Sequence, residues 1–166
     1  MKYLLPLFGI LLIACDGPDR LAVVELQPLR DSGVGGEVYF REQGDYVKVT
    51  GAVFGLQPNS VHAFHVHKYG DCGNNGENAG DHFNPFQEPH GKFGEPPHHA
   101  GDFPQLVADD DGQATIDFVA ESFRLTDERS SVIGKALIVH QSHDKYTQPS
   151  GDAGSRIACG IILQKD

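Results

Sequence analysis

Short runs of alternating apolar and polar residues, separated by turn residues, make up most of the chain after residue 20. Valine and other β-branched residues are frequent within the runs, and Gly, Asn, Asp and Pro fill the gaps between them. No segment shows a sustained helical period of 3.6 residues. The runs that predict strands cover residues 21–26, 37–42, 46–54, 61–67, 105–108, 113–120, 134–140 and 157–164. Eight short strands spaced by turns predict an all-β, eight-stranded sandwich or barrel.

Two polar segments interrupt this pattern. Residues 68–104 are rich in Gly, Pro, Asn and His and have little strand character, and residues 141–155 form a shorter segment of similar composition. A long irregular loop inside a compact domain is usually functional, because ordering its backbone costs about 1–2 kcal/mol per residue. We therefore expect a disulfide or bound metal to hold the longer segment in place.

The first fifteen residues have the pattern of an export signal. Lys2 precedes an apolar stretch, residues 3–14, that is too short to span a bilayer of ~30 Å and is typical of a secretory signal. Residues 12–15, Leu-Ile-Ala-Cys, resemble a bacterial lipobox, in which the cysteine is lipidated. We predict a lipoprotein signal peptide over residues 1–14, lipidated Cys15 and a tether over residues 15–20, and one domain over residues 21–166. The alternatives are a plain signal peptide and a buried N-terminal strand.

This interpretation predicts a location and a use for the cysteines. The lipid on Cys15 would hold the domain at the periplasmic face of a membrane. Asp16 favours the inner membrane, because this residue is associated with inner-membrane retention in enteric-type sorting. Cys72 and Cys159 then remain in an oxidising compartment, which predicts a disulfide between them, with two unpaired thiols as the alternative.

Composition narrows the partners of the chain. A net charge of −10 argues against nucleic acid as a partner and leaves no basic patch for anionic lipid. Nine histidines in 166 residues are a first indication of a metal site. His65 and His67 share one face of a predicted strand and could form half of a transition-metal site. Further candidate ligands are His82, His90, His98, His99, Asp102, His140 and His143.

Four motifs carry a resemblance that extends over residues 20–166. They are HAFHVH at 62–67, DHFNP at 81–85, HAGD at 99–102 and GSRIACG at 154–160. In this order and spacing the chain resembles the copper/zinc superoxide dismutases, most closely those exported by bacteria. The resemblance implies a Greek-key barrel with a long metal-binding loop and a shorter electrostatic loop. It also implies an oxidoreductase that converts superoxide to dioxygen and hydrogen peroxide by alternating between Cu(II) and Cu(I).

The resemblance further implies one copper and one zinc ion per subunit, with a role for each residue of the site. His82 would bridge the two ions, leave copper on reduction and take up a proton. Asp144 matches a carboxylate that joins a copper ligand to a zinc ligand, and Arg156 matches the cation that holds superoxide. The same resemblance pairs Cys72 with Cys159. The implied ligands of copper are His65, His67, His82 and His140, and those of zinc are His82, His90, His99 and Asp102.

Four other residues near these motifs lie outside the implied ligand sets: His62, Ala63, His98 and His143. Ala63 stands where the family usually has glycine, which is tolerated only if the backbone φ there is negative. His98 directly precedes His99, and the spacing to Asp102 favours His99 as the ligand. His62 points to the opposite face from His65 and is interpreted as a structural histidine, and His98 and His143 as surface histidines.

Because the net charge of −10 repels superoxide, local cations must attract it. Arg156 is the main candidate and Lys145 a second one. Two other functions stay open: a copper- and zinc-binding protein of the cell envelope without redox turnover, and an adhesion domain with vestigial histidines. Monomer and homodimer are both compatible with the sequence.

Overall fold

Ten β-strands and one short 3-10 helix form the part of the chain that the computed structural model describes, residues 20–165. The predicted signal peptide and Cys15 lie outside these residues. The strands are β1 (Arg20–Pro28), β2 (Gly35–Gln43), β3 (Tyr46–Phe54), β4 (Val61–His62), β5 (Phe64–His67), β6 (Leu106–Val107), β7 (Ala114–Ala120), β8 (Ala136–His140), β9 (Arg156–Ile161) and β10 (Leu163–Lys165), and the helix is η1 (Glu77–Ala79).

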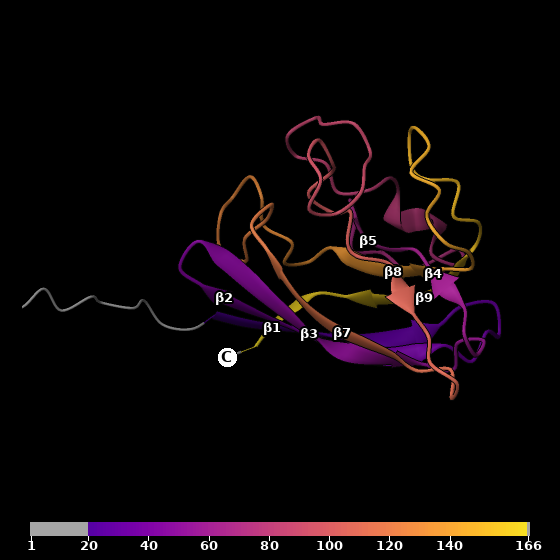
Figure 1. Ribbon diagram of the computed structural model, residues 1–166. Helices are drawn as coiled ribbons and strands as arrows, with labels where there is room; N and C mark the ends of the chain where they lie inside the picture. Colours follow the sequence, from indigo (N-terminus) through magenta and orange to yellow (C-terminus); the bar gives the residue numbers. More distant parts are fainter. Residues whose placement is uncertain (1–19, 166) are drawn as a thin grey trace, which may run out of the picture.

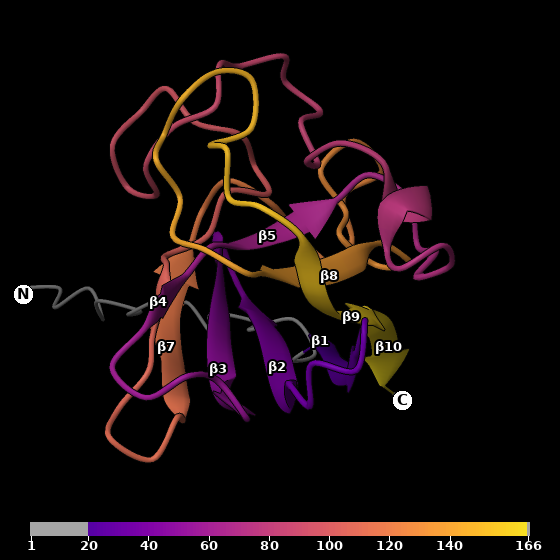
Figure 2. The same ribbon diagram turned by 90° about the vertical axis from the view of Figure 1, so that its right-hand side faces the viewer.

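The larger sheet is antiparallel and curled (Figures 1 and 2). Its order is β5-β8-β9-β1-β2-β3-β7, with β10 also paired to β1, and β4 and β6 form a separate two-stranded sheet. Strands β1, β2 and β3 follow one another directly, and the later strand β9 returns beside β1, which is the order of a Greek key. Figure 2 shows β5 and β8 running across the direction of β2 and β3. The predicted all-β fold is confirmed.

All eight predicted strand regions contain strands, but two of them are divided. Residues 61–67 separate into β4 and β5 at Ala63, whose N–H donates to Ser142 O and whose carbonyl accepts from His140 N. Residues 157–164 separate into β9 and β10 at Ile162, which bonds to the loop before β8. Ala63 does not have a positive φ, so its methyl group is tolerated in place of glycine.

The core fills the inside of the curled sheet. In β2, Val38 and Phe40 are buried while Tyr39 and Arg41 are exposed, as the alternation of a strand requires. Phe40 also belongs to a group of aromatic rings with centroids 5.1–6.3 Å apart, together with Phe64, Phe103, Phe118 and Phe123. Every residue of β5 and β8 is buried, so the strands that carry His65, His67 and His140 rest on a packed core.

Two loops rise together from one side of the sheet (Figure 1). The longer one joins β5 to β6, and the shorter one joins β8 to β9. A disulfide between Cys72 and Cys159 fastens the longer loop to β9, which confirms the predicted pairing. Gly101 fastens it to β5 through its bond to Val66 N, and a Cβ at Gly101 would lie 2.4 Å from Val66 O. Glycine is therefore required for this close approach.

A search of residues 20–165 for a helix long and apolar enough to cross a membrane finds none.

Removal of the disulfide should destabilise the fold strongly. The bonded cysteines are 87 residues apart, and closure of so long a loop stabilises the native state by about 4–5 kcal/mol in the chain-entropy model. We expect a loss of this order in the Cys72→Ser, Cys159→Ser double variant. Denaturant unfolding of the metal-free protein measures the change, and wild-type protein kept reduced is the control. Equal stability of the oxidised wild type and the double variant would contradict the expectation.

Candidate metal centre

Six histidines and two aspartates meet between the two loops and the ends of β5 and β8. All eight side chains are buried, although they come from four separate parts of the chain. Strand β5 contributes two of them, the end of β8 one, the longer loop four and the shorter loop one. They are His65, His67, His82, His90, His99, Asp102, His140 and Asp144.

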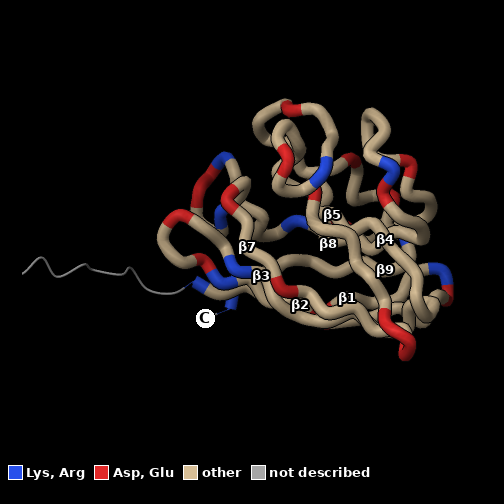
Figure 3. Tube along the Cα trace, in the orientation of Figure 1, with Lys and Arg blue, Asp and Glu red and all other residues tan. Residues whose placement is uncertain are grey.

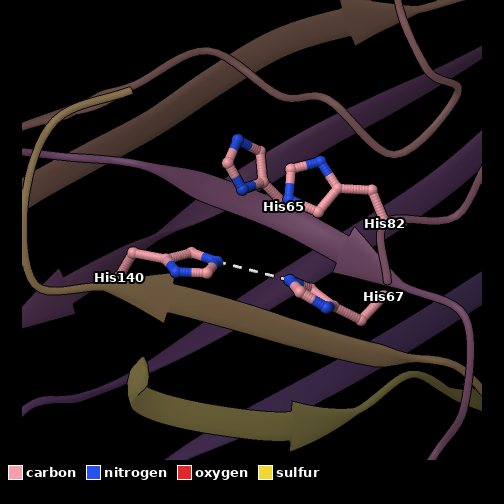
Figure 4. Close-up of side chains that lie close together, drawn as sticks. All are labelled: His65, His67, His82 and His140. Carbon is pink, nitrogen blue, oxygen red and sulfur yellow. Dashed lines mark hydrogen bonds between the residues drawn. The ribbon is translucent and has the colours of Figure 1, made fainter. Parts of the chain in front are cut away.

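The first ligand set consists of four histidines whose nitrogen atoms lie within 4.8 Å of one another: His65, His67, His82 and His140. Figure 4 shows these rings around a common centre, with Nε2 of His67 and Nε2 of His140 3.3 Å apart. The Nδ1 atoms of His67 and His140 face the carbonyl oxygens of Gly80 and Gly154. Because a carbonyl only accepts, Nδ1 carries the proton in both rings, and the Nε2 lone pairs are left for the centre.

The second ligand set combines three histidines with one carboxylate: His82, His90, His99 and Asp102. Nδ1 of His82 lies 2.8 Å from Asp102 Oδ1, Nδ1 of His90 2.9 Å from Oδ2, and Nδ1 of His99 3.2 Å from Oδ1. The carboxylate is itself fixed by the backbone, since Oδ2 accepts from the N–H groups of Gly91 and His99. Asp102 therefore sets the position of this whole group.

His82 belongs to both sets. Its ring centroid lies 4.0 Å from that of His65 in the first set and 5.1 Å from that of His90 in the second. Nδ1 of His82 is directed to Asp102, so Nε2 is the nitrogen left for the first set. One imidazole can thus offer a ligand atom to each of two metal ions.

Asp144 connects the two sets through ring nitrogens that face away from the ligand centres. Its Oδ2 accepts from Nε2 of His65 at 2.8 Å, and its Oδ1 accepts from Nε2 of His90 at 3.0 Å. These bonds orient both rings so that the opposite nitrogen, Nδ1, faces its ligand set. The N–H of Tyr146 donates to the same Oδ1, and Gln105 accepts from the N–H of Asp144, which holds the carboxylate in place.

The donor atoms fit two transition-metal ions. Among residues 20–165, the Nδ1 atoms of His65, His90 and His99 are buried without a hydrogen-bond partner, because the short approaches of His90 and His99 to Asp102 do not have hydrogen-bond angles. An unsatisfied buried polar atom costs about 1–3 kcal/mol, and a bound cation removes this cost. Four nitrogens suit copper, and three nitrogens with one carboxylate oxygen suit zinc.

Burial adjusts the protonation of the site. It lowers the pKa of His82 to about 4 and of His140 to about 3, and it lowers that of His67 as well, so these rings are neutral as ligands must be. Burial would raise the pKa of Asp102, but the hydrogen bond from His82 and the nearby His90 and His99 rings outweigh this effect and hold the carboxyl ionised. Burial would lower the pKa of His90, but the close carboxylates of Asp102 and Asp144 raise it to about 9. Metal binding near neutral pH must therefore release a proton from His90.

Arg156 stands at the edge of a cleft of about 300 Å³ that reaches His67, His82 and His140. Its guanidinium group donates to the carbonyl oxygens of Gly76 and, at 2.7 Å, Gly80. Gly80 O also accepts from His67, so one carbonyl positions both the cation and a ring of the first set. Burial lowers the pKa of Arg156, but a guanidinium remains charged at any physiological pH.

The other polar residues singled out in the sequence lie outside the two sets. His62 bonds to His140 O and Ser60 Oγ, which fits the structural role predicted for it. His98 bonds to the carbonyl of His99 and His143 is exposed. Lys145 is ion-paired with Asp152 at 2.6 Å. Of the two adjacent histidines, the structure thus brings His99, and not His98, to the site.

Two supporting residues were missed by the sequence analysis. Gln148 accepts from the N–H of His90 and donates to its carbonyl at 2.7 Å, which joins the two loops. Gly151 has a φ of +79°, and a Cβ there would lie 1.9 Å from Asp144 Oδ1. Neither contact has a signal in the sequence, because each depends on how one loop lies against the other.

Comparisons with known proteins agree with this geometry. Residues 34–162 match the model of the family described as "Copper/zinc superoxide dismutase (SODC)". The chain is 39% identical over 144 residues to a protein of Onchocerca volvulus named "Extracellular superoxide dismutase [Cu-Zn]", an alignment that covers 80% of this chain and 71% of the relative. A protein of Brugia pahangi with the same name is 36% identical over 143 residues, with the same two shares covered.

A methyl group at Gly151 should disturb the site through Asp144. We expect Gly151→Ala to push the Asp144 carboxylate away from His65 and His90 and to weaken zinc binding about 10- to 100-fold, as loss of a ligand's hydrogen-bond partner does elsewhere. Gly94→Ala is the matched control, because Gly94 has the same φ of +79° and no atom within 4 Å of the added Cβ. Metal analysis after dialysis against a graded zinc chelator measures the difference. Equal zinc retention by the two variants would disprove this role of Gly151.

Proposed function

The chain belongs to the copper/zinc superoxide dismutase family, and on this premise we propose how its own residues carry out the reaction. It is an oxidoreductase that converts superoxide to dioxygen and hydrogen peroxide, with copper and zinc as cofactors. The observation that carries the residue assignment is the position of the His82 ring between the two ligand sets.

We assign the first set to copper and the second to zinc. His65, His67 and His140 each present one unprotonated nitrogen to the copper position, and His82 supplies the fourth. His90, His99, Asp102 and Nδ1 of His82 surround the zinc position, where the carboxylate offsets part of the added charge. When bound, copper supplies the one-electron cycle between Cu(II) and Cu(I), and zinc supplies a fixed positive charge beside His82.

The reaction consumes two protons for every two molecules of superoxide, so a proton carrier must stand at the site. His82 suits this task, because Nδ1 stays engaged beside Asp102, Nε2 is left free of it, and the residue lines the cleft. We propose that Nε2 of His82 holds a proton in one half of the cycle and gives it to the product in the other. Asp144 keeps the neighbouring ring of His65 from rotating during this exchange.

Arg156 provides the charge that binds the substrate anion. Its guanidinium group lines the same cleft as His67, His82 and His140, and two carbonyl oxygens hold it there. A partly buried cation attracts an anion more strongly than an exposed one, because less water screens it. We propose that Arg156 holds superoxide next to the copper position.

Metal analysis combined with an activity assay tests this function. Purified protein should hold one copper and one zinc ion per chain and consume superoxide, and chelation followed by restoration of both metals should abolish and then recover the activity. The alternative is a copper- and zinc-binding protein without redox turnover. Stoichiometric metal with no consumption of superoxide would support that alternative and overturn the proposal.

The location is proposed on separate grounds. Both relatives are named extracellular enzymes, which together with the apolar leader supports export of this chain. We propose in addition that Cys15 is lipidated and that the residues between Cys15 and β1 tether the domain to the periplasmic face of the inner membrane. A monomer and a homodimer are both compatible with the sequence.

Lipidation at Cys15 has a direct test. Cells that express the wild-type chain should incorporate a labelled fatty acid into it, because the thiol at the end of the leader is the modified group. The Cys15→Ser variant should carry no label. Cys72→Ser is the matched control and should keep the label, since Cys72 lies within the folded domain. Label on the Cys15→Ser chain would exclude Cys15 as the anchor.

Replacement of Arg156 tests the substrate site. Arg156→Ile should lower kcat/KM by about tenfold or more through loss of a positive charge near the metal, while copper and zinc contents stay unchanged. Arg156→Lys keeps the charge but loses the planar contact to Gly76 and Gly80. Its kcat/KM should therefore lie between those of the wild type and Arg156→Ile. Pulse radiolysis measures the rates, and equal kcat/KM for the wild type and Arg156→Ile would refute this role.

A further inference from the structure

A second hollow, of about 490 Å³, opens next to the cleft at Arg156. We call it the lysine hollow, and its walls include Lys68, Lys135, Phe83 and Asp81. It shares His82, Asp81 and Ser150 with the cleft, so the two spaces meet at the ring assigned as the bridge between the metal ions. An anion in the lysine hollow would therefore be next to the cleft that contains the proposed copper ligands.

The strand register places Lys68 and Lys135 opposite each other. His67 of β5 pairs with Ala136 of β8, and Lys68 and Lys135 are the next residues beyond this last pair. Nζ of Lys135 lies 4.3 Å from the centre of the Phe83 ring on the wall of the hollow. Burial lowers the pKa of Lys135, and the charge of Lys68 lowers it further, so the two ammonium groups repel each other. Like charges directly opposite in a β ladder are destabilising.

Neither lysine of this pair has an ion-pair partner within the described part of the chain. Three other lysines there are ion-paired, Lys48 with Asp117, Lys92 with Glu95 and Lys145 with Asp152, whereas neither Lys68 nor Lys135 has a carboxylate oxygen within 4 Å. Figure 3 shows acidic residues interspersed with basic ones over the loops and the sheet. A lysine pair without an ion-pair partner in a chain of net charge −10 is therefore a local feature that needs an explanation.

We propose that Lys68 and Lys135 are positioning residues that collect superoxide in the lysine hollow and deliver it to the cleft at Arg156. The proposal rests on the dismutation of superoxide by this chain. Two ammonium groups and the single carboxylate of Asp81 leave the hollow with a net charge of +1, opposite in sign to the whole protein. A local positive region focuses the field and raises the rate of encounter with a small anion. Lys145, the cation favoured by the sequence for this task, is instead neutralised by Asp152.

Charge removal in the metal-loaded protein tests the delivery of superoxide. We expect the Lys68→Gln, Lys135→Gln double variant to lose about three- to tenfold in kcat/KM at low ionic strength, with a weaker dependence on salt than the wild type. Copper and zinc contents should not change, and Lys68→Arg with Lys135→Arg should restore the rate and its salt dependence. Lys48→Gln is the control, because it removes the same charge from β3, outside the residues that line the hollow, and should keep both properties.

Binding of inorganic phosphate provides a readout that needs no turnover. The phosphorus-31 line width of phosphate, titrated without superoxide, should report tighter binding to the wild type and Lys48→Gln than to the double variant, which keeps only the binding at Arg156. If no form consumes superoxide, the dismutation itself is wrong, and the phosphate titration still decides whether the hollow binds anions. Loss of phosphate binding with unchanged kcat/KM would assign the hollow to a resident anion and overturn the delivery role. Equal behaviour of the double variant and Lys48→Gln in both assays would overturn the proposal entirely.

Discussion

The site depends on one buried carboxylate, that of Asp102. It receives three histidine nitrogens on one side and two backbone N–H groups on the other. A buried charge is costly unless it is fully partnered, and here the partners are the groups that must converge on a cation. The bond to Asp102 also fixes which nitrogen of His82 faces each ligand set. Without this carboxylate the bridging ring would have no defined orientation, and the two metal positions would lose their common ligand.

The segment between Cys72 and His82 attaches the site to the sheet. The disulfide fastens its first residue to β9, the strand that begins with Arg156. Arg156 bonds to two carbonyls of this same segment, and one of them, Gly80 O, also orients His67. The covalent link, the cation proposed to bind superoxide and a proposed copper ligand are thus joined through a few residues of backbone. A long loop can hold side chains in defined positions when the contacts that anchor the loop also hold the residues of the site.

Much of this arrangement could be predicted from the sequence, and the limits have physical causes. Alternation of apolar residues located all eight strand regions, because burial on one face of a sheet leaves a period of two. The break at Ala63 could not be predicted, since it depends on hydrogen bonds to Ser142 and His140 rather than on local preference. The motifs gave the histidines of the site, but not the contacts of Gly151 and Gln148 with them. Those contacts exist only once the two loops lie side by side.

The distribution of charge near the site also depends on the fold and cannot be predicted from the net charge. A net charge of −10 predicts repulsion of an anionic substrate, and the sequence places Lys145 near the site as a remedy. Folding pairs Lys145 with Asp152 and instead brings together Lys68 and Lys135, which are far apart along the chain. Superoxide responds to the field near the cleft, because exposed charges more than about 8–10 Å away are largely screened at physiological salt. In the proposed delivery of superoxide, an acidic protein therefore attracts its anionic substrate through a few cations that strand register places beside the cleft.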